Sequence, residues 1–450
     1  MDHLKVFILH MAYVCEYVHI CTYNGLHTLF FVYTGNAALK EQLLDYILEN
    51  YFSSDIHEGG YKAMYNEIVK RTAKLVAQWQ GVGFVHGVLN TDNMSMLGLT
   101  IDYGPFGFME YFDPDFVPNG SDSSGRYSYE KQPEICKWNL KKLAEALAPL
   151  LPESDSSTVL ATYDEVYNNE YMTIMNAKLG LGGNETSLNS TNKKTVEEFF
   201  NTMQSCGTDF TGAFQAFTFY RQQGLNEQNI NDLATELATI SANPQEMSSM
   251  IKKKMKISRL SMPPEQIEGI WQLCQSDPAR IESMFNAPVG DIKREIQGEK
   301  EKLDRLISCS EKLKMLESLS KDDKLTRDKG IWINYLQNHY MPVVRELSSS
   351  ASSSAVMENM QAANPTFILK NWIAQDAIES ADGGDYSKVR KLLSMLETPF
   401  SPSFSSMRDG ANSLSKCNYG SGGNNSVDID TMYCGRSPSS SNDVICTCSS

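Results

Sequence analysis

The chain has 450 residues, enough for two to four domains of ordinary size, and its apolar fraction of 41% is enough to form substantial cores. Its formal net charge is −15, so it repels nucleic-acid backbones and anionic membranes, and neither is expected as a partner. The run Lys252–Lys256 is a local exception, which we interpret as a solvated helix face.

Residues 1–33 are apolar and aromatic but fit no targeting segment. They have no small-residue cleavage pattern, and polar residues interrupt every window long enough to span a membrane. An arginine-rich transit peptide is also not readable in them. Two interpretations stay open for this segment: a buried strand-and-turn unit, or a wrongly predicted first exon.

The rest of the chain up to residue 400 is predicted to be mostly helical, with short strands or strand-like loop edges at Phe84-Val85 and Met94–Ile101. A serine-rich linker is predicted at Ser348–Ser354, and a disordered tail rich in Ser, Gly and Asn beyond Ser401. Apolar periodicity predicts helices at residues 36–52, 61–80, 133–151, 164–179, 196–206, 230–242, 264–286, 291–319, 330–347, 366–380 and 386–398.

Two short motifs carry readable chemistry, HGVLNTDN at residues 86–93 and IDYG at residues 101–104. Kinase-type enzymes hold Mg²⁺ with the Asn that closes the catalytic loop and the Asp of a following D-x-G. Asn93 and Asp102 stand in that order, nine residues apart, and supply the hard oxygen ligands that Mg²⁺ prefers. Either motif alone is commonly a structural turn. Together they predict the metal-and-phosphate edge of a kinase-like nucleotide site.

One position departs from the small-molecule kinases of this type, which carry Asp two residues after the histidine. Here that position is Val88, and a carboxylate stands instead at Asp92, beside Asn93. An ordinary hydroxyl-phosphorylating kinase is therefore not the first choice. We expect His86 to support the loop by packing and hydrogen bonding rather than to act as a catalytic acid.

Longer stretches resemble the selenoprotein O family of protein adenylyltransferases. The resemblance covers roughly residues 36–400 and the last few residues. The stretches that carry it are VGFVHGVLNTDNMSMLGLTIDYGPFGFMEYFDPDF at 82–116, GRYSYEKQPEICKWNLKKLAEAL at 125–147, GTDFTGAF at 207–214 and NPTFILKNWIAQDAIESADGGDYSKVRKLLSMLETPF at 364–400.

This resemblance implies an α+β, protein-kinase-like fold that is mostly α in this chain. An atypical apolar segment (1–35) would precede a C-lobe core with the metal and nucleotide motif (36–150). A helical extension (151–400) and the tail (401–450) would follow. The family's N-lobe would lie upstream of residue 36. Residues 1–33 contain Lys5 as their one strong cation and no glycine-rich loop, so we expect the N-lobe to be missing.

The resemblance also implies an activity. ATP would bind in an inverted orientation, so that AMP is transferred to Ser, Thr or Tyr hydroxyls of protein substrates. Asp92 would be the proton acceptor, and Asn93 and Asp102 the ligands of Mg²⁺ or Mn²⁺, with Asp102 also against ATP. The family implies mitochondria as the location, and the cytosol is the alternative.

The cysteines add a redox question. The ten cysteines are scattered without zinc-site spacing, which is typical of a reducing compartment. Cys448 stands where animal members of the family often carry selenocysteine, with Cys446 two residues earlier, so both are redox candidates. An inert tail thiol is the alternative. Pro118 stands where the family often has a loop cysteine, which argues against a bridge from tail to loop.

Two other functions compete with adenylyl transfer. Without the cationic N-lobe, a phosphate site loses charge-assisted contacts of about 1.5–3 kcal/mol each, which weakens ATP binding by orders of magnitude. The chain would then be a catalytically dead, pseudokinase-like binding or regulatory module. The third function, transfer of the γ-phosphoryl group, is disfavoured by Val88.

Overall fold

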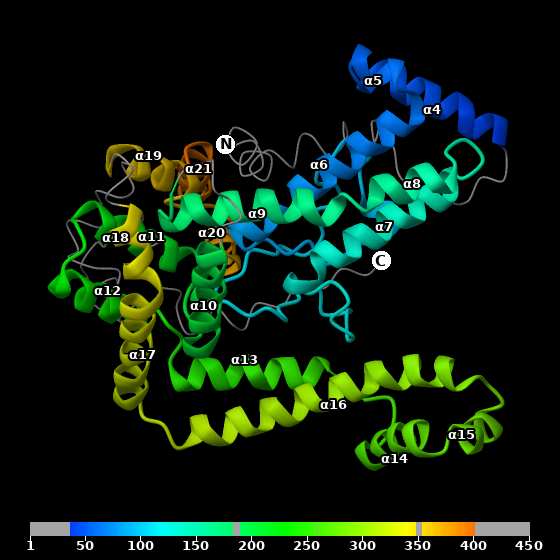
Figure 1. Ribbon diagram of the computed structural model, residues 1–450. Helices are drawn as coiled ribbons and strands as arrows, with labels where there is room; N and C mark the ends of the chain where they lie inside the picture. Colours follow the sequence, from blue (N-terminus) through cyan, green and yellow to red (C-terminus); the bar gives the residue numbers. More distant parts are fainter. Residues whose placement is uncertain (1–36, 183–189, 259, 348–352, 401–450) are drawn as a thin grey trace.

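The computed structural model describes residues 37–182, 190–258, 260–347 and 353–400, and this part is built almost wholly of α-helices (Figure 1). It contains isolated β-bridges but no extended strand. The helical part of the predicted α+β class is confirmed. No short strand forms at Phe84-Val85 or Met94–Ile101. Phe84 forms an isolated antiparallel bridge with Phe108, so the first of these segments fits the alternative prediction of a strand-like loop edge.

The described elements follow one another through short connections except between residues 94 and 128, where the chain is irregular. In chain order they are α4 (Ala37–Tyr51), α5 (Ser54–Glu58), α6 (Gly60–Val82), η1 (Thr91–Asn93), η2 (Tyr129–Lys131), α7 (Gln132–Leu147), α8 (Glu153–Leu160), α9 (Tyr163–Leu179), α10 (Ser190–Cys206), α11 (Phe210–Gln222), α12 (Glu227–Thr239), α13 (Pro244–Ile257), α14 (Pro264–Ser276), α15 (Pro278–Phe285), α16 (Val289–Glu317), α17 (Lys321–Tyr335), η3 (Leu336–Tyr340), α18 (Met341–Leu347), α19 (Ser353–Ala363), α20 (Asn371–Asp382) and α21 (Ser387–Glu397).

Two large hydrophobic cores share helix α9. The first core takes side chains from α4, α6, α7 and the start of α9, and the second from the end of α9 with α10, α11, α12 and α17. Helices α6 and α9 lie side by side (Figure 1), and a Cβ added at Gly81 would come within 2.8 Å of Ile174 Cγ2. A glycine at this contact lets the two backbones approach closely.

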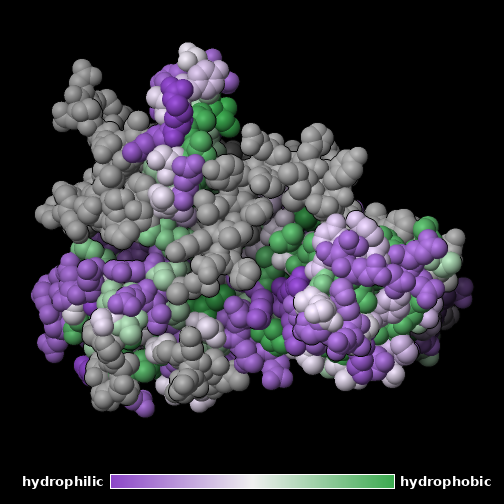
Figure 2. Space-filling model, turned by 90° about the horizontal axis from the view of Figure 1, so that it is seen from above, coloured by the Kyte–Doolittle hydropathy of each residue, from purple (hydrophilic) through white to green (hydrophobic). Residues whose placement is uncertain are grey.

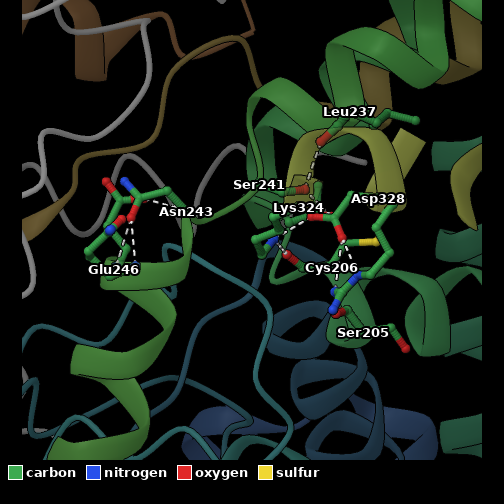
Figure 3. A network of polar contacts seen from close by, with 11 residues as sticks. Ser205, Cys206, Leu237, Ser241, Asn243, Glu246, Lys324 and Asp328 are labelled. Carbon is green, nitrogen blue, oxygen red and sulfur yellow. Dashed lines mark hydrogen bonds and ion pairs between the residues drawn. The ribbon is translucent and has the colours of Figure 1, made fainter. Parts of the chain in front are cut away.

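A buried lysine of α17, Lys324, ties this helix to the end of α10 (Figure 3). Lys324 Nζ contacts Asp328 Oδ2 and donates a hydrogen bond to Cys206 O at 2.8 Å. Arg327 Nη2 donates to Ser205 O at 3.0 Å. Cations at a helix C-terminus satisfy its last carbonyls and oppose the helix dipole. The end of α10, which leads into the GTDFTGAF motif, is therefore fixed from α17.

Helices α13 and α16 form a layer below the main body in Figure 1, and α14 and α15 cover its far end with two small cores of their own. Lys254 on α13 lies 3.2 Å from Asp113 Oδ1 and also contacts Asp115. The expected solvated face is thus found at Lys252 and Lys256, which are exposed, but not at Lys254, which is half-buried in these pairs.

Proline accounts for one helix boundary and one irregular helical turn that were not predicted. The single helix expected at 264–286 is divided at Asp277, because Pro278 disfavours a helical conformation in the residue before it. The helix expected at 330–347 begins earlier, at Lys321, and contains the π-helical segment η3 shortly before Pro342. A proline has no N–H for the helical ladder, and a wider turn accommodates that loss.

The helix predicted at 366–380 begins only at Asn371. The preceding segment is held by Gln215 Nε2, which donates to Pro365 O at 2.9 Å and to Thr366 O at 3.0 Å. Helices α5, α8, α11 and α19 were not predicted, and of α13 only the face of the lysine run was expected. Helix α19 takes in the end of the predicted linker. The segments predicted at 1–35 and 401–450 lie outside the described residues.

Hydrophilic residues cover much of the described surface seen from above, with smaller hydrophobic areas between them (Figure 2). Leu39 and Tyr46 on α4 are among the exposed apolar side chains. No helix in the described ranges is long and apolar enough to span a membrane.

The buried amine of Lys178 generates a pH-dependent prediction. Its Nζ donates to Ala363 O at 3.2 Å and lies 4.3 Å from the Phe214 ring centroid. Burial lowers its pKa from 10.5 to about 7. Between these values the unfolded chain binds more protons than the folded chain, so folding becomes more favourable as the pH rises.

Replacing Lys178 with Met removes this proton linkage. The free energy of unfolding of the wild type, measured by urea denaturation, should therefore rise between pH 6.5 and pH 9.5 relative to Lys178→Met. A difference between the two proteins that does not change with pH would contradict the assignment.

Candidate functional site

The site motifs lie on one hairpin, residues 83–109, which we call the site hairpin. Gly83 ends α6 in the left-handed conformation, with φ of 69°. The chain then pairs with the returning segment, since Val85 N donates to Gly107 O at 2.8 Å and Met109 N to Gly83 O at 2.9 Å. This short antiparallel pairing closes the loop that carries both motifs.

Successive side chains along the hairpin are buried in different cores, and this alternation fixes the register of the pairing. Phe84 and Phe108 pack in the first core, whereas Val85 and Met109 pack in the second. Successive side chains of an extended segment point to opposite sides, so a slip by one residue would exchange the two sets. The hairpin therefore sits at the junction of the two cores, where its position is determined from both sides.

His86 joins the start of the loop to its end. Its side chain is buried, and Nε2 lies 2.8 Å from Ile101 O, the residue before Asp102. Burial lowers the pKa of His86, although the Ile101 carbonyl and the Asp102 charge act in the opposite direction. A neutral ring that donates from Nε2 leaves Nδ1 as an acceptor, and Nδ1 finds no partner among the described residues. The supporting role expected for His86 agrees with this geometry.

The turn that carries Asp92 is organised by the carbonyl of Val88. Val88 O accepts hydrogen bonds from Asn90 N at 2.9 Å and from Asn93 Nδ2 at 2.8 Å. The second bond orients the Asn93 amide, so that its Oδ1 is the atom left for a ligand. The Val88 side chain is only 3% exposed. The position where small-molecule kinases carry Asp is therefore part of the hydrophobic core here.

Asp102 is exposed and adopts a left-handed backbone conformation, with φ of 51°. Asp and Asn are the side chains that best tolerate this region after glycine, and such outliers often mark functional sites. Because the Ile101 carbonyl is held by His86, the backbone that presents the Asp102 carboxylate is fixed on one side.

Side chains from the following segment support the turn. Asn139 Nδ2 donates to Leu89 O at 3.0 Å, Tyr127 OH donates to Asn90 Oδ1, and Asn119 Nδ2 lies 3.4 Å from Gly87 O. Sequence reasoning did not single out these three residues. Two of them fall inside the stretch 125–147 that resembles the family, and this was the one signal that could have identified them.

A cavity of about 190 Å³ lies beside the site hairpin, between residues 108–128 and helices α13 and α16. Pro118 lines the cavity and also packs closely against the site hairpin. A Cβ added at Gly87 would lie only 2.8 Å from Pro118 Cγ. Burial opposes the charge on Lys254, but Asp113 and Asp115 outweigh it and raise the pKa of Lys254. Lys254 therefore stays charged and closes one side of the cavity.

The hairpin brings Asp92, Asn93 and Asp102 onto one loop, with Asp92 and Asn93 in η1 and Asp102 at the return of the chain. No cluster of three His, Cys, Asp or Glu side chains suited to a metal occurs in the described part. An oriented amide oxygen and an exposed carboxylate fit Mg²⁺, which commonly takes few protein ligands and completes its shell with phosphates and water. Cys446 and Cys448 lie outside the described residues.

The motifs can now be compared with known proteins. A family model described as "Protein adenylyltransferase SelO" matches residues 25–397. The chain belongs to the SelO family. This confirms the resemblance to the selenoprotein O family within that range. The tail lies beyond the match, so the correspondence of Cys448 to a selenocysteine position stays a prediction.

Curated members of the SelO family give the same assignment. "Protein adenylyltransferase SelO-1, mitochondrial" of Danio rerio is 38% identical over 381 residues, which are 82% of this chain and 52% of the relative. The Homo sapiens relative, "Protein adenylyltransferase SelO, mitochondrial", is 38% identical over 81% of this chain and 53% of its own length. "Protein nucleotidyltransferase YdiU" of Myxococcus xanthus is 32% identical over 82% and 56%. The chain thus spans about half the length of the curated SelO relatives it matches.

The pairing that closes the site hairpin predicts that position 107 cannot accommodate any side chain larger than that of glycine. An alanine Cβ there would lie 1.9 Å from Val85 O, so Gly107→Ala must break the hairpin pairing. We expect it to lower the free energy of unfolding by about 3 kcal/mol or more, measured by urea denaturation. Gly298→Ala in α16 is the matched control, because nothing lies near its Cβ and alanine favours a helix by about 0.5–1 kcal/mol. Equal effects of the two changes would contradict the hairpin geometry.

The contact of His86 with Ile101 predicts different effects for two substitutions. His86→Leu leaves the Ile101 carbonyl buried without its donor, which should cost about 1–3 kcal/mol in the free energy of unfolding. His86→Gln keeps a side-chain N–H donor and should recover part of that loss. Hydrogen exchange of the amides around Asp102 should increase in His86→Leu. Unchanged exchange there would show that the histidine does not anchor the loop.

Proposed function

We propose that this chain carries the metal-holding half of a protein adenylyltransferase site, which transfers AMP from ATP to Ser, Thr or Tyr hydroxyls of proteins. The observation that carries the proposal is the oriented Asn93 amide on the same loop as the exposed Asp102 carboxylate. The names of the curated SelO relatives support the reaction class. Because the chain spans about half of their length, the activity is proposed for a protein of the full family length.

The fold proposed for that full-length protein is protein-kinase-like. Residues 36–150 would form the C-lobe core and residues 151–400 the helical extension, and the N-lobe would supply the remaining contacts to ATP. These boundaries follow from the resemblance and stay predictions. The first hydrophobic core supports the proposed boundary at residue 150, because it is built mainly from helices before residue 151.

In the proposed reaction, the acceptor hydroxyl attacks the α-phosphorus of ATP. A bond forms between that oxygen and phosphorus, the bond to the pyrophosphate oxygen breaks, and Asp92 accepts the hydroxyl proton. Asn93 Oδ1 and the Asp102 carboxylate would hold Mg²⁺ or Mn²⁺, which neutralises phosphate charge when bound. Asp102 would also lie against ATP. The burial of Val88 supports AMP transfer over γ-phosphoryl transfer, because no carboxylate stands at the kinase position.

The Danio rerio, Homo sapiens and Mus musculus relatives are named mitochondrial, and we propose the same location, with the cytosol as the alternative. The partners proposed are ATP and hydroxyl-bearing protein substrates. Neither a nucleic acid nor a membrane is proposed as a partner, since the net charge of −15 disfavours both.

The proposed reaction is tested with ATP labelled at the α-phosphate, using this chain and a protein of the full family length. Asp102→Ala should reduce transfer of label by on the order of 100-fold or more, since a metal ligand contributes several kcal/mol to the transition state. Asp92→Asn should reduce it by about 10²–10⁴-fold, the usual contribution of a general base. Asp322→Ala, an exposed carboxylate on α17, is the control and should retain activity.

The same assay separates the competing functions. Label transferred from the γ-phosphate instead would establish a phosphotransferase. Calorimetric binding of ATP with Mg²⁺ but no transfer of either label by the full-length protein would favour the binding or regulatory module. Full activity of Asp102→Ala would show that the ligand assignment is wrong.

A further inference from the structure

A stack of aromatic and cationic side chains lies next to the site hairpin. Arg126 Cζ is 5.0 Å from the centroid of the Trp138 ring and 5.7 Å from that of Tyr127. Lys142 Nζ lies 5.4 Å from the Trp138 ring. We call these four residues the cation platform. A guanidinium held against two rings is pre-oriented, and each such contact is worth about 0.5–1 kcal/mol at an exposed position.

Two hydrogen bonds connect the cation platform to the turn that carries Asp92. Tyr127 OH donates to Asn90 Oδ1. Asn139, the residue after Trp138, donates to Leu89 O at 3.0 Å. The platform is therefore attached to the backbone that directly precedes Asp92, and a chain that presents a hydroxyl there passes close to it.

The platform is exposed and positively charged. Arg126 is exposed and forms no ion pair with a carboxylate of the described residues, and Trp138 is 42% exposed. The segment from Arg126 to Lys142 contains five Lys or Arg and two Glu, in a chain whose net charge is −15. Lys137 pairs with Asp164 at 2.5 Å and Lys142 with Glu145 at 2.7 Å, so Arg126 is the cation of the platform that forms no such pair among the described residues. Its guanidinium has the planar donor geometry that matches a carboxylate.

We propose that the cation platform binds an acidic side chain of the protein substrate, a few residues from the hydroxyl that receives AMP. This inference rests on the proposed function, because it assigns a specificity determinant to the same site. Arg126 supplies the paired N–H donors, and Trp138 and Tyr127 hold the guanidinium. Lys142, which is paired with Glu145, lies against the Trp138 ring. The platform would select among substrates and takes no part in the transfer of AMP.

The first test measures binding and does not depend on catalysis. Fluorescein-labelled serine peptides are prepared in pairs that differ only in Glu against Gln at the flanking positions, and their affinity for this chain and for the full-length protein is measured by anisotropy. The Glu peptide should bind about fivefold to tenfold more tightly than the Gln peptide. Arg126→Gln should reduce that preference to less than twofold, and Arg126→Lys should restore part of it.

Matched controls come from a distant part of the chain. Arg294 on α16 is also an exposed arginine, at 81% side-chain exposure, and Arg294→Gln should keep the preference for Glu. Lys293 and Trp271 form a comparable cation–ring pair at 5.8 Å. Trp271→Leu should leave the preference unchanged, whereas Trp138→Leu should weaken it. The proposal would be overturned if the preference for the Glu peptide fell equally in all four variants, or if the wild type showed no such preference.

The second test uses AMP transfer by the full-length protein. Arg126→Gln should raise the KM for the Glu peptide by about fivefold to tenfold, the factor expected for binding. It should leave kcat and the KM for ATP unchanged. A raised KM for ATP with every peptide would mean that the platform serves the nucleotide phosphates, and the proposal would be wrong. If no peptide is labelled by the wild type, the proposed function fails, while the anisotropy result still decides whether the platform binds acidic peptides.

Discussion

Two backbone hydrogen bonds, Val85 N to Gly107 O and Met109 N to Gly83 O, close the loop that carries the proposed proton acceptor and the proposed metal ligands. The packing on both sides of these two bonds fixes the register of the pairing. Neighbouring residues of each segment are buried in different hydrophobic cores, so the pairing cannot shift without exposing apolar side chains on both sides. Since the described residues form no sheet, this junction provides the rigidity that a site on an otherwise long loop requires.

The same constraint extends toward the C-terminal part of the chain. Beyond the hairpin, Phe112 N donates to Thr208 O at 2.9 Å, and Phe210 N donates to Glu110 O at 2.7 Å. Asp209, between these two partners, caps α11 and forms a buried ion pair with Lys370. Two motifs that the resemblance singled out without a role, at 207–214 and 364–400, thus meet behind the site. Their contribution is to hold the segment that follows the site hairpin.

Site residues and helices could be predicted from the sequence where the residues that determine them lie close together in the chain. The spacing of Asn93 and Asp102 could be interpreted because both lie on one loop, and the amphipathic helices α6 and α21 have one apolar side. Helix α11 is buried almost all around, so it has no periodicity to detect, although Asp209 is its N-cap. Helix α13 could have been found, because Asn243 and Glu246 form a capping box. The bonds from Tyr127 and Asn139 to the turn span 37 and 50 residues, and no local pattern predicts such contacts.

The backbone conformation of Asp102 has a consequence for how this family can lose activity. With φ at 51°, position 102 accepts Gly, Asn or Asp and disfavours nearly every other residue, whatever the side chain binds. In a lineage that no longer transfers AMP, selection for folding alone would still keep one of these three residues there. Asp92 lies in a short 3₁₀ turn without that restriction, so it would be free to diverge first. Under the roles proposed above, substitution of Asp92 in a distant homologue would therefore indicate lost AMP transfer earlier than a change at position 102. An aspartate at 102 would be weak evidence of activity.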